Sequence, residues 1–319
     1  MEIYINVREF IGNEKGKDVS KEIQSVIDEN PNRVLFFPDG EYLIGEPILT
    51  PADPQKSVSL KLSDFAIIRA TDTWNSDEAM VRLGGKDSAN IIEVACTNYG
   101  IEGGIIDCQG VAKGISVDSG RETYIRNVSI KNAMVGIHIK DGINNGSSDA
   151  DVSSVNITCN DSRESVGLLI NGSDNTFTNI RIGRVFTGVV VSSGGNMLRN
   201  VHPLYYITSP TYPDYSESTG FLITSKSRHN WFDYCYSDNF ATGFKTLHGG
   251  GVIENCFAFW YSKGDCKHVG LESPVPFRGR ISGYEIGGKC DASGENKFSE
   301  NLILADEAIV EGVFVDSRQ

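Results

Sequence analysis

Phe177-Thr-Asn-Ile-Arg-Ile182 is one copy of a six-residue pattern that recurs along most of the chain. The pattern is an apolar residue, any residue, Asn or another small or polar residue, an apolar residue, any residue and an apolar residue. Its copies occupy residues 101–106, 125–130, 152–157, 177–182, 198–203, 232–237 and 253–258. Their starts are 24, 27, 25, 21, 34 and 21 residues apart, which predicts a stacked repeat with loops of variable length.

A second pattern alternates with the first and consists of a glycine followed by alternating apolar residues. Its glycines are Gly114, Gly136, Gly167, Gly188, Gly220 and Gly243. Each repeat therefore contains at least two short strands with one apolar face, and only stacking of repeat on repeat buries that face. Asn127, Asn179, Asn200 and Asn255 share one equivalent position, where left-handed corners and a ladder of side-chain amides are expected. These features predict a parallel β-helix.

The N-terminal region adds a family resemblance. It is carried by Asp18–Glu29, by Arg33–Ile44 with its Phe-Pro-Asp-Gly-Glu-Tyr run, and by Glu46-Pro-Ile48. Together with the repeats, these segments resemble right-handed parallel β-helix proteins of the pectate lyase superfamily, especially the pectate-lyase-3 and tailspike-like group. The resemblance implies an all-β, single-stranded right-handed parallel β-helix with a short capping helix within residues 18–30. The resemblance does not identify an activity, because this fold hosts lyases, hydrolases, epimerases, transferases and non-enzymatic spikes.

The repeats run without a Pro- or Ser-rich linker, so the 319 residues are expected to form a single domain. Residues 1–50 would form the cap and first coil, residues 51–290 the coils, and residues 291–319 the C-terminal end. Of the seven cysteines, Cys235 and Cys256 stand at inward positions and are interpreted as buried, inert thiols. Neither a metal nor a cofactor is expected, because no cluster has the spacing of metal ligands.

Charge and hydropathy exclude several partners. A net charge of -13 argues against nucleic acid, whose binding requires a cationic surface. No apolar stretch approaches the length of a membrane span. The first ten residues lack a charged segment followed by an apolar run, so the protein is expected to be cytoplasmic, or secreted if a signal peptide has been removed.

Outward positions of the six-residue pattern bring acids together. The second position places Asp233 and Glu254 on adjacent rungs beside Arg199, at a strand spacing of roughly 4.8 Å. Two acids this close cannot both ionise cheaply, so such a pair can divide into a proton donor and a nucleophile or base. Retaining glycosidases use a carboxyl separation of about 5–5.5 Å. Asp233 and Glu254 are therefore the predicted catalytic residues, with their individual roles unassigned.

Polar and aromatic residues around this pair suit a sugar. The predicted substrate-binding residues are Arg181, Arg199, His202, Trp231, Tyr236, Asp238, Lys245 and His248. The last two belong to the Gly243 strand and would line a neighbouring groove. The alternative is a solvated face on which Arg199, Asp233 and Glu254 only form ion pairs across rungs.

The expected function is therefore that of a glycoside hydrolase or glycan-rearranging enzyme acting on an oligo- or polysaccharide in a surface groove. One alternative is a non-catalytic, tailspike-like glycan-binding module in which Trp231 and Trp260 hold the sugar. A polysaccharide lyase or an enzyme similar to inulin fructotransferases is a further alternative. The motifs of polygalacturonases and the Arg-x-Pro-x-x-Arg signature of calcium-type pectate lyases are absent.

One outward column predicts assembly. Leu169, Val190 and Leu222 would expose three apolar side chains on consecutive rungs. Such a stripe favours a partner surface. β-helices of the type that this chain resembles often trimerise side by side, so the resemblance implies a homotrimer. The alternative is that the insertion at residues 203–218 covers the stripe.

Overall fold

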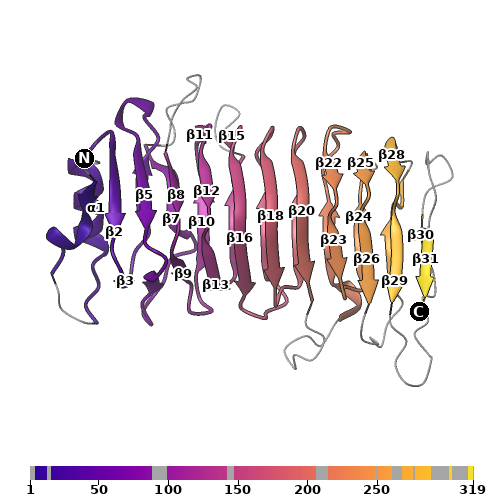
Figure 1. Cartoon of the computed structure of the whole chain (residues 1–319), viewed down its shortest axis with the longest axis horizontal. Helices are drawn as coiled ribbons and strands as arrows, with labels where there is room; N and C mark the ends of the chain where they lie inside the picture. The colour runs from indigo at the N-terminus through magenta and orange to yellow at the C-terminus, as the bar shows by residue number, and fades with distance from the viewer. Residues whose placement is uncertain are drawn as a thin grey trace. The chain divides into compact units, whose positions relative to one another are not determined.

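A computed structural model of the chain describes residues 4–12, 16–87, 99–141, 147–205, 215–248, 250–260, 268–275, 277–288, 302–303 and 315–318. The chain divides into two compact units, Met1–Asn160 and Asp161–Gln319, which we call the N-terminal and C-terminal units. Both units are built from parallel strands (Figure 1). The single-domain organisation stays a prediction, and most of residues 291–319 lie outside the described residues.

The N-terminal unit begins with an amphipathic helix, α1 (Ser20–Glu29). Ile23, Val26 and Ile27 are spaced so that one helical face is apolar, and all three are buried. The side-chain amide of Gln24 accepts a hydrogen bond from the Leu49 N–H at 2.8 Å and donates one to the Leu49 carbonyl at 3.0 Å. Leu49 lies in β4 (Ile48–Pro51), the edge strand of its sheet. The predicted capping helix is confirmed, and it satisfies part of an otherwise open sheet edge.

Two large sheets and the two-stranded sheet of β11 (Gly120–Arg121) and β15 (Ser147–Ser148) form the rest of the N-terminal unit, and all their pairings are parallel. One row of the first sheet contains β1 (Ile5–Asn6), β2 (Arg33–Phe37), β5 (Val58–Leu62), β8 (Gly100–Glu102), β12 (Tyr124–Arg126) and the start of β16 (Asp151–Cys159). The adjoining row contains β3 (Gly40–Ile44), β6 (Ala66–Ala70), β9 (Ile105–Asp107), β13 (Ser129–Ala133) and the end of β16. The second sheet contains β4, β7 (Ala79–Lys86), β10 (Lys113–Val117) and β14 (Val135–Ile139).

The C-terminal unit repeats this arrangement. Its first sheet contains β18 (Thr176–Gly183), β20 (Met197–Leu204), β22 (Trp231–Asp233), β23 (Tyr236–Asp238), β25 (Gly251–Glu254), β26 (Phe257–Trp260), β28 (Gly279–Ser282), β29 (Glu285–Gly288) and β31 (Val315–Arg318). Its second sheet contains β17 (Val166–Ile170), β19 (Thr187–Val191), β21 (Thr219–Ile223), β24 (Thr242–Thr246), β27 (Val269–Glu272) and β30 (Leu302–Ile303). In Figure 1, β18, β20, β22, β25 and β28 lie side by side in this order.

The core of the C-terminal unit lies between its two sheets. Phe177, Leu198, Phe232 and Ile253 are paired from strand to strand and are 0% exposed. From the second sheet, Phe244 packs against Phe232, with ring centroids 6.2 Å apart. Successive coils therefore stack equivalent apolar residues, as the repeat predicts. The predicted right-handed parallel β-helix with an N-terminal capping helix is confirmed.

The repeated asparagines lie at left-handed corners. Asn179, Asn200 and Asn255 have φ angles of +56°, +53° and +52° in the C-terminal unit, and Asn127 has +55° in the N-terminal unit. Asn tolerates this conformation better than most residues because its short amide can bond locally. The Asn200 amide donates a hydrogen bond to the Asn179 side chain at 2.8 Å. The predicted ladder is therefore present between these two rungs.

The inward cysteines behave as the repeat predicts. Cys235 and Cys256 are both 0% exposed and form no disulfide. Burial raises the pKa of the Cys256 thiol, which keeps it protonated and unreactive. Within the described ranges, no helix is long and apolar enough to cross a membrane.

Candidate functional site

The predicted catalytic acids lie on the outward face of the first sheet of the C-terminal unit. Asp233 of β22 and Glu254 of β25 are register partners, and Arg199 of β20 is the partner of Asp233 on the preceding rung. The side chains of Asp233 and Glu254 are half-buried, with exposed fractions of 29% and 27%. The structure thus brings together the residues that the second position of the pattern selects, one strand spacing apart.

Each carboxylate also faces an arginine. The Arg199 Nε atom lies 3.4 Å from the Asp233 Oδ2 atom, and the guanidinium of Arg280 pairs with Glu254. The Asn255 side chain donates a hydrogen bond to Asp233 Oδ1 at 3.4 Å. We call Arg199, Asp233, Glu254 and Arg280 the charged column. Its order of one cation, two anions and one cation places positive charge on both sides of the acids.

Arg280 was not among the residues predicted for the site. It lies in β28, where Val252 is its register partner, two residues before the partner of Glu254. Residues 281–286, Ile-Ser-Gly-Tyr-Glu-Ile, are a further copy of the six-residue pattern. Extending the repeat by one coil would have placed Ser282 beside Glu254 and Arg280 beside Val252, so the register alone does not predict the ion pair of Arg280 with Glu254.

An aromatic column runs beside the charged column. It comprises His202, Tyr236 and Phe257. The His202 and Tyr236 rings are stacked with centroids 4.2 Å apart, and the Tyr236 and Phe257 centroids are 5.2 Å apart. Arg181, predicted for the same column, is exposed, and its guanidinium donates a hydrogen bond to the Asn200 carbonyl at 3.3 Å. Arg181, His202 and Tyr236, which were predicted for the site, therefore share one outward face with Phe257.

Asp238 is the most deeply placed acid of this face. It is 8% exposed, and its Oδ2 atom lies 3.5 Å from the His202 Nε2 atom, which is longer than a good hydrogen bond. Neither Asp238 Oδ1 nor His202 Nε2 has a hydrogen-bond partner among the described residues. Buried polar atoms without a hydrogen-bond partner are uncommon in folded proteins.

Two large apolar side chains are exposed at the start of the same strands. Trp231 of β22 is 37% exposed, and its register partner Met197 of β20 is 43% exposed. Trp231 is therefore accessible from solvent, and its contact with a ligand stays a prediction. Trp260 does not, because it is 1% exposed and its indole N–H donates to the Phe240 carbonyl. The suggestion that Trp260 holds sugar is wrong, since it occupies an inward position beyond the end of the six-residue pattern.

Lys245 and His248 are not brought to the acids. Lys245 lies on the outward face of β24 in the second sheet, where its ammonium is 3.2 Å from Glu272. Its neighbour Phe244 points into the core against Phe232, so Lys245 projects from the opposite side of the coil from Asp233. His248 is exposed just after this strand.

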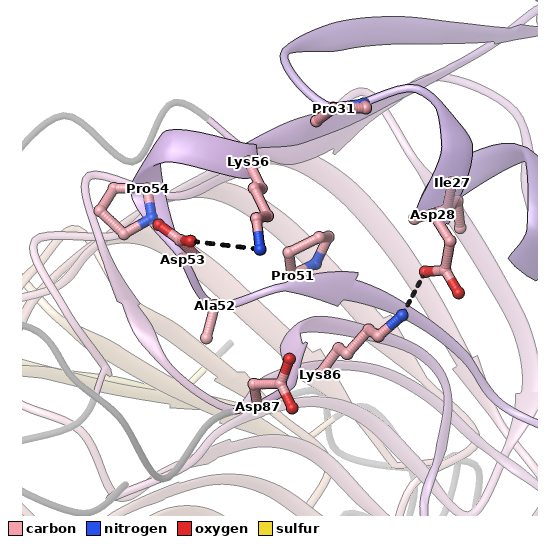
Figure 2. Close-up of a pocket in the computed structure, with 10 residues that line it drawn as sticks. All are labelled: Ile27, Asp28, Pro31, Pro51, Ala52, Asp53, Pro54, Lys56, Lys86 and Asp87. Carbon is pink, nitrogen blue, oxygen red and sulfur yellow. Dashed lines mark ion pairs between the residues drawn. The ribbon is translucent and has the colours of Figure 1, made fainter.

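A cavity of about 540 Å³ lies in the N-terminal unit. Figure 2 shows its lining, which comes from the end of α1, the segment from β4 to the short helix η2 (Pro54–Lys56), and the end of β7. Lys86 pairs with Asp28 at 2.7 Å, and Lys56 with Asp53 at 3.8 Å. Its charged side chains thus include two internal ion pairs, and none of the predicted site residues lines it. Among the described residues, no group of three His, Cys, Asp or Glu side chains is arranged to hold a metal ion.

Solved structures with the same fold are found at low sequence identity. The ORF18 protein of Geobacillus virus E2 aligns over 99% of this chain and 62% of its own length, with a TM-score of 0.66 and 15% identity. The tailspike protein of E. coli bacteriophage HK620, in complex with a pentasaccharide, aligns over 98% and 65%, with a TM-score of 0.70 and 10% identity. The A-module of the mannuronan C-5 epimerase AlgE4 of Azotobacter vinelandii aligns over 99% and 97%, with a TM-score of 0.56 and 13% identity.

These similarities define the class of protein by its fold. This chain is a parallel β-helix protein, as are the tailspike and the epimerase module, so the resemblance inferred from residues 18–48 and the repeats is confirmed for the fold. The chain spans less than two thirds of the length of the two viral proteins. No protein-family model matches it, and no curated protein matches it in sequence.

Proposed function

We propose that this chain binds an oligo- or polysaccharide on the outward face of the first sheet of the C-terminal unit and hydrolyses it with Asp233 and Glu254. The observation that carries the proposal is the register that places these two acids on adjacent strands, flanked by Arg199 and Arg280. The aromatic column and the exposed Trp231 lie in the same strands and offer apolar surfaces to the C–H faces of sugar rings.

In the proposed reaction, one acid protonates the glycosidic oxygen and the other attacks the anomeric carbon or activates water. Arg199 and Arg280 would bind substrate oxygens through their N–H groups. The carbohydrate ligands of other β-helix proteins support this substrate class, as in the tailspike with its bound pentasaccharide.

The test is a panel of oligo- and polysaccharides, screened for binding by calorimetry and for cleavage by product analysis. We expect at least one saccharide to bind and to be cleaved, and Asp233→Asn and Glu254→Gln each to lower turnover at least about 100-fold. Asp151→Asn is the matched control, because Asp151 also forms an exposed ion pair across rungs, with Arg126. It should leave turnover unchanged.

A second candidate function is a binding module that does not cleave its ligand. The observation in its favour is that both acids are engaged by arginines, as on a charged protein surface that only forms ion pairs. Binding of a saccharide without any product would establish this alternative. Full turnover by both the Asp233→Asn and Glu254→Gln variants would place the chemistry elsewhere, and binding of no saccharide would refute both candidates.

We also propose that the chain assembles into a homotrimer through Leu169, Val190 and Leu222. These residues are register partners on β17, β19 and β21, and each is partly exposed on the outward face. Such a contiguous apolar stripe is suited to a subunit contact. Light scattering at micromolar concentration should give three times the chain mass, and Val190→Asp should lower the mass without unfolding the protein. A wild-type monomer would contradict the proposal.

A further inference from the structure

Tyr234 has a backbone conformation that is costly for an aromatic residue. It occupies the corner position between Asn200 and Asn255 in successive coils, and its φ angle is +51°. The equivalent residues are Asn179, Asn200 and Asn255, followed by Gly283 with φ of +60°. Asn and Gly adopt the left-handed region readily, whereas a bulky side chain there is a genuine outlier. Such residues persist where the surroundings hold them in place, and they cluster at functional sites.

The contacts of Tyr234 do not explain this cost. Its side chain is 58% exposed and has no ring contact or hydrogen bond with another described residue. Its backbone N–H donates to the Glu254 carbonyl at 3.2 Å, so the corner itself is held by the neighbouring coil. The tyrosine also interrupts the amide ladder, since the Asn200 amide bonds back to Asn179 and the Asn255 amide bonds to Asp233. The fold would be better served by asparagine.

The position of Tyr234 suggests what its ring is for. Tyr234 and Trp231 lie on either side of Asp233 in one rung, and both rings are exposed. Two exposed aromatic rings around a half-buried carboxylate match the two surfaces of a sugar, which has apolar C–H faces and a rim of hydroxyls. Arg199, paired with Asp233, adds N–H donors at the same place. Such a combination of side chains would suit a sugar subsite on the β22 rung.

We infer that Tyr234 is a saccharide-stacking residue, kept in a strained conformation because its ring, together with Trp231, places a sugar against Asp233. This inference rests on the proposed function, and it adds a binding residue and a subsite to it. The inference requires that the Tyr234 ring increases the affinity for the saccharide and lowers the thermal stability of the protein. Removing the ring in one variant should therefore lower the affinity and raise the unfolding temperature, and both can be measured on that variant.

The experiment replaces Tyr234 with asparagine, the residue found at the equivalent position on four other rungs. The Tyr234→Asn variant should unfold at a higher temperature than the wild type, by about 1–3 °C, because the corner strain is relieved. Its affinity for the saccharide that binds best in the panel should fall by roughly 3- to 12-fold, because a stacking contact is lost. Calorimetric titration and thermal unfolding give the two values.

Three further variants separate the causes. Tyr234→Phe keeps the ring and should bind as the wild type does. Tyr234→Ala loses the ring without the left-handed preference of asparagine, so it should bind weakly and gain less stability than Tyr234→Asn. Phe65→Asn removes a different exposed aromatic ring, which is 73% exposed and lies in the N-terminal unit, and it should leave affinity unchanged.

Each contrary result has a distinct meaning. If the wild type binds a saccharide and Tyr234→Asn binds it equally well, the inference is overturned while the proposed function stands. If Tyr234→Asn unfolds at a lower temperature than the wild type, the tyrosine ring stabilises the fold. The ring would then not be a strained residue kept for binding, which also overturns the inference. If no saccharide binds the wild type, the proposed function and the subsite are refuted together.

Discussion

A single buried histidine makes the stability of the C-terminal unit sensitive to mild acid. His268 is 2% exposed, its ring packs 5.3 Å from that of Trp260, and its Nε2 atom lies 3.0 Å from the Tyr215 hydroxyl. Burial lowers the pKa of His268 to about 4. Between about pH 4 and 6.5 the unfolded chain therefore binds a proton that the folded chain does not, so stability falls as the pH falls through this window.

We expect the free energy of unfolding to fall by up to about 3 kcal/mol between pH 7 and pH 4.5 because of His268. Urea unfolding at several pH values measures this change. A His268→Gln variant lacks the titrating group and should show a flatter profile in this window. Equal pH profiles of the variant and the wild type would contradict this account of His268.

The sequence predicts individual residues well where the repeat continues and poorly where it is interrupted. The pairing of Asp233 with Glu254 follows from counting positions in the six-residue pattern, because register fixes which side chains become neighbours. Tyr234 occupies a position where the pattern allows any small or polar residue, so only its φ angle and its exposure in the structure mark it as unusual. The inward position of Trp260 lies beyond the pattern, and its burial could not be read from it.

The glycines of the second sheet of the C-terminal unit determine how closely the strands of that sheet approach the first sheet. An ideal Cβ atom on Gly188 of β19 would lie 2.4 Å from the Pro203 Cβ and 2.5 Å from the Gly220 carbonyl oxygen. The oxygen belongs to the backbone of β21 and cannot move without disturbing that strand. Gly188→Ala should therefore cost about 1–3 kcal/mol of unfolding free energy, as overpacking generally does.

Urea unfolding measures this loss against a glycine that has room. An ideal Cβ on Gly12 meets no atom within 4 Å, so Gly12→Ala should change stability by less than about 0.5 kcal/mol. If the two substitutions changed the free energy of unfolding by similar amounts, the close contact of Gly188 with Pro203 and Gly220 would not be the reason that this position requires glycine. The sequence shows that these glycines recur. Why the positions require glycine becomes clear only from the atoms of the neighbouring coils in the structure.

The β-helix as a whole was predictable because each coil repeats the same short-range pattern. The apolar positions, the corner asparagines and the amphipathic capping segment each follow from local spacing, and they agree with one another. The functional site was only partly predictable, because it combines outward residues from several coils. Outward positions are not constrained by the core, so their chemistry must be judged from contacts such as those of Arg280 with Glu254.

The most direct test of the proposed glycan-binding face is a crystal structure of the protein with a saccharide from the panel. We predict that the saccharide lies on the outward face of β20, β22 and β25, with a sugar ring against Trp231 and Tyr234 and a hydroxyl within hydrogen-bonding distance of Asp233. A saccharide bound instead beside Lys245 on the second sheet, or in the cavity next to Lys86, would contradict it.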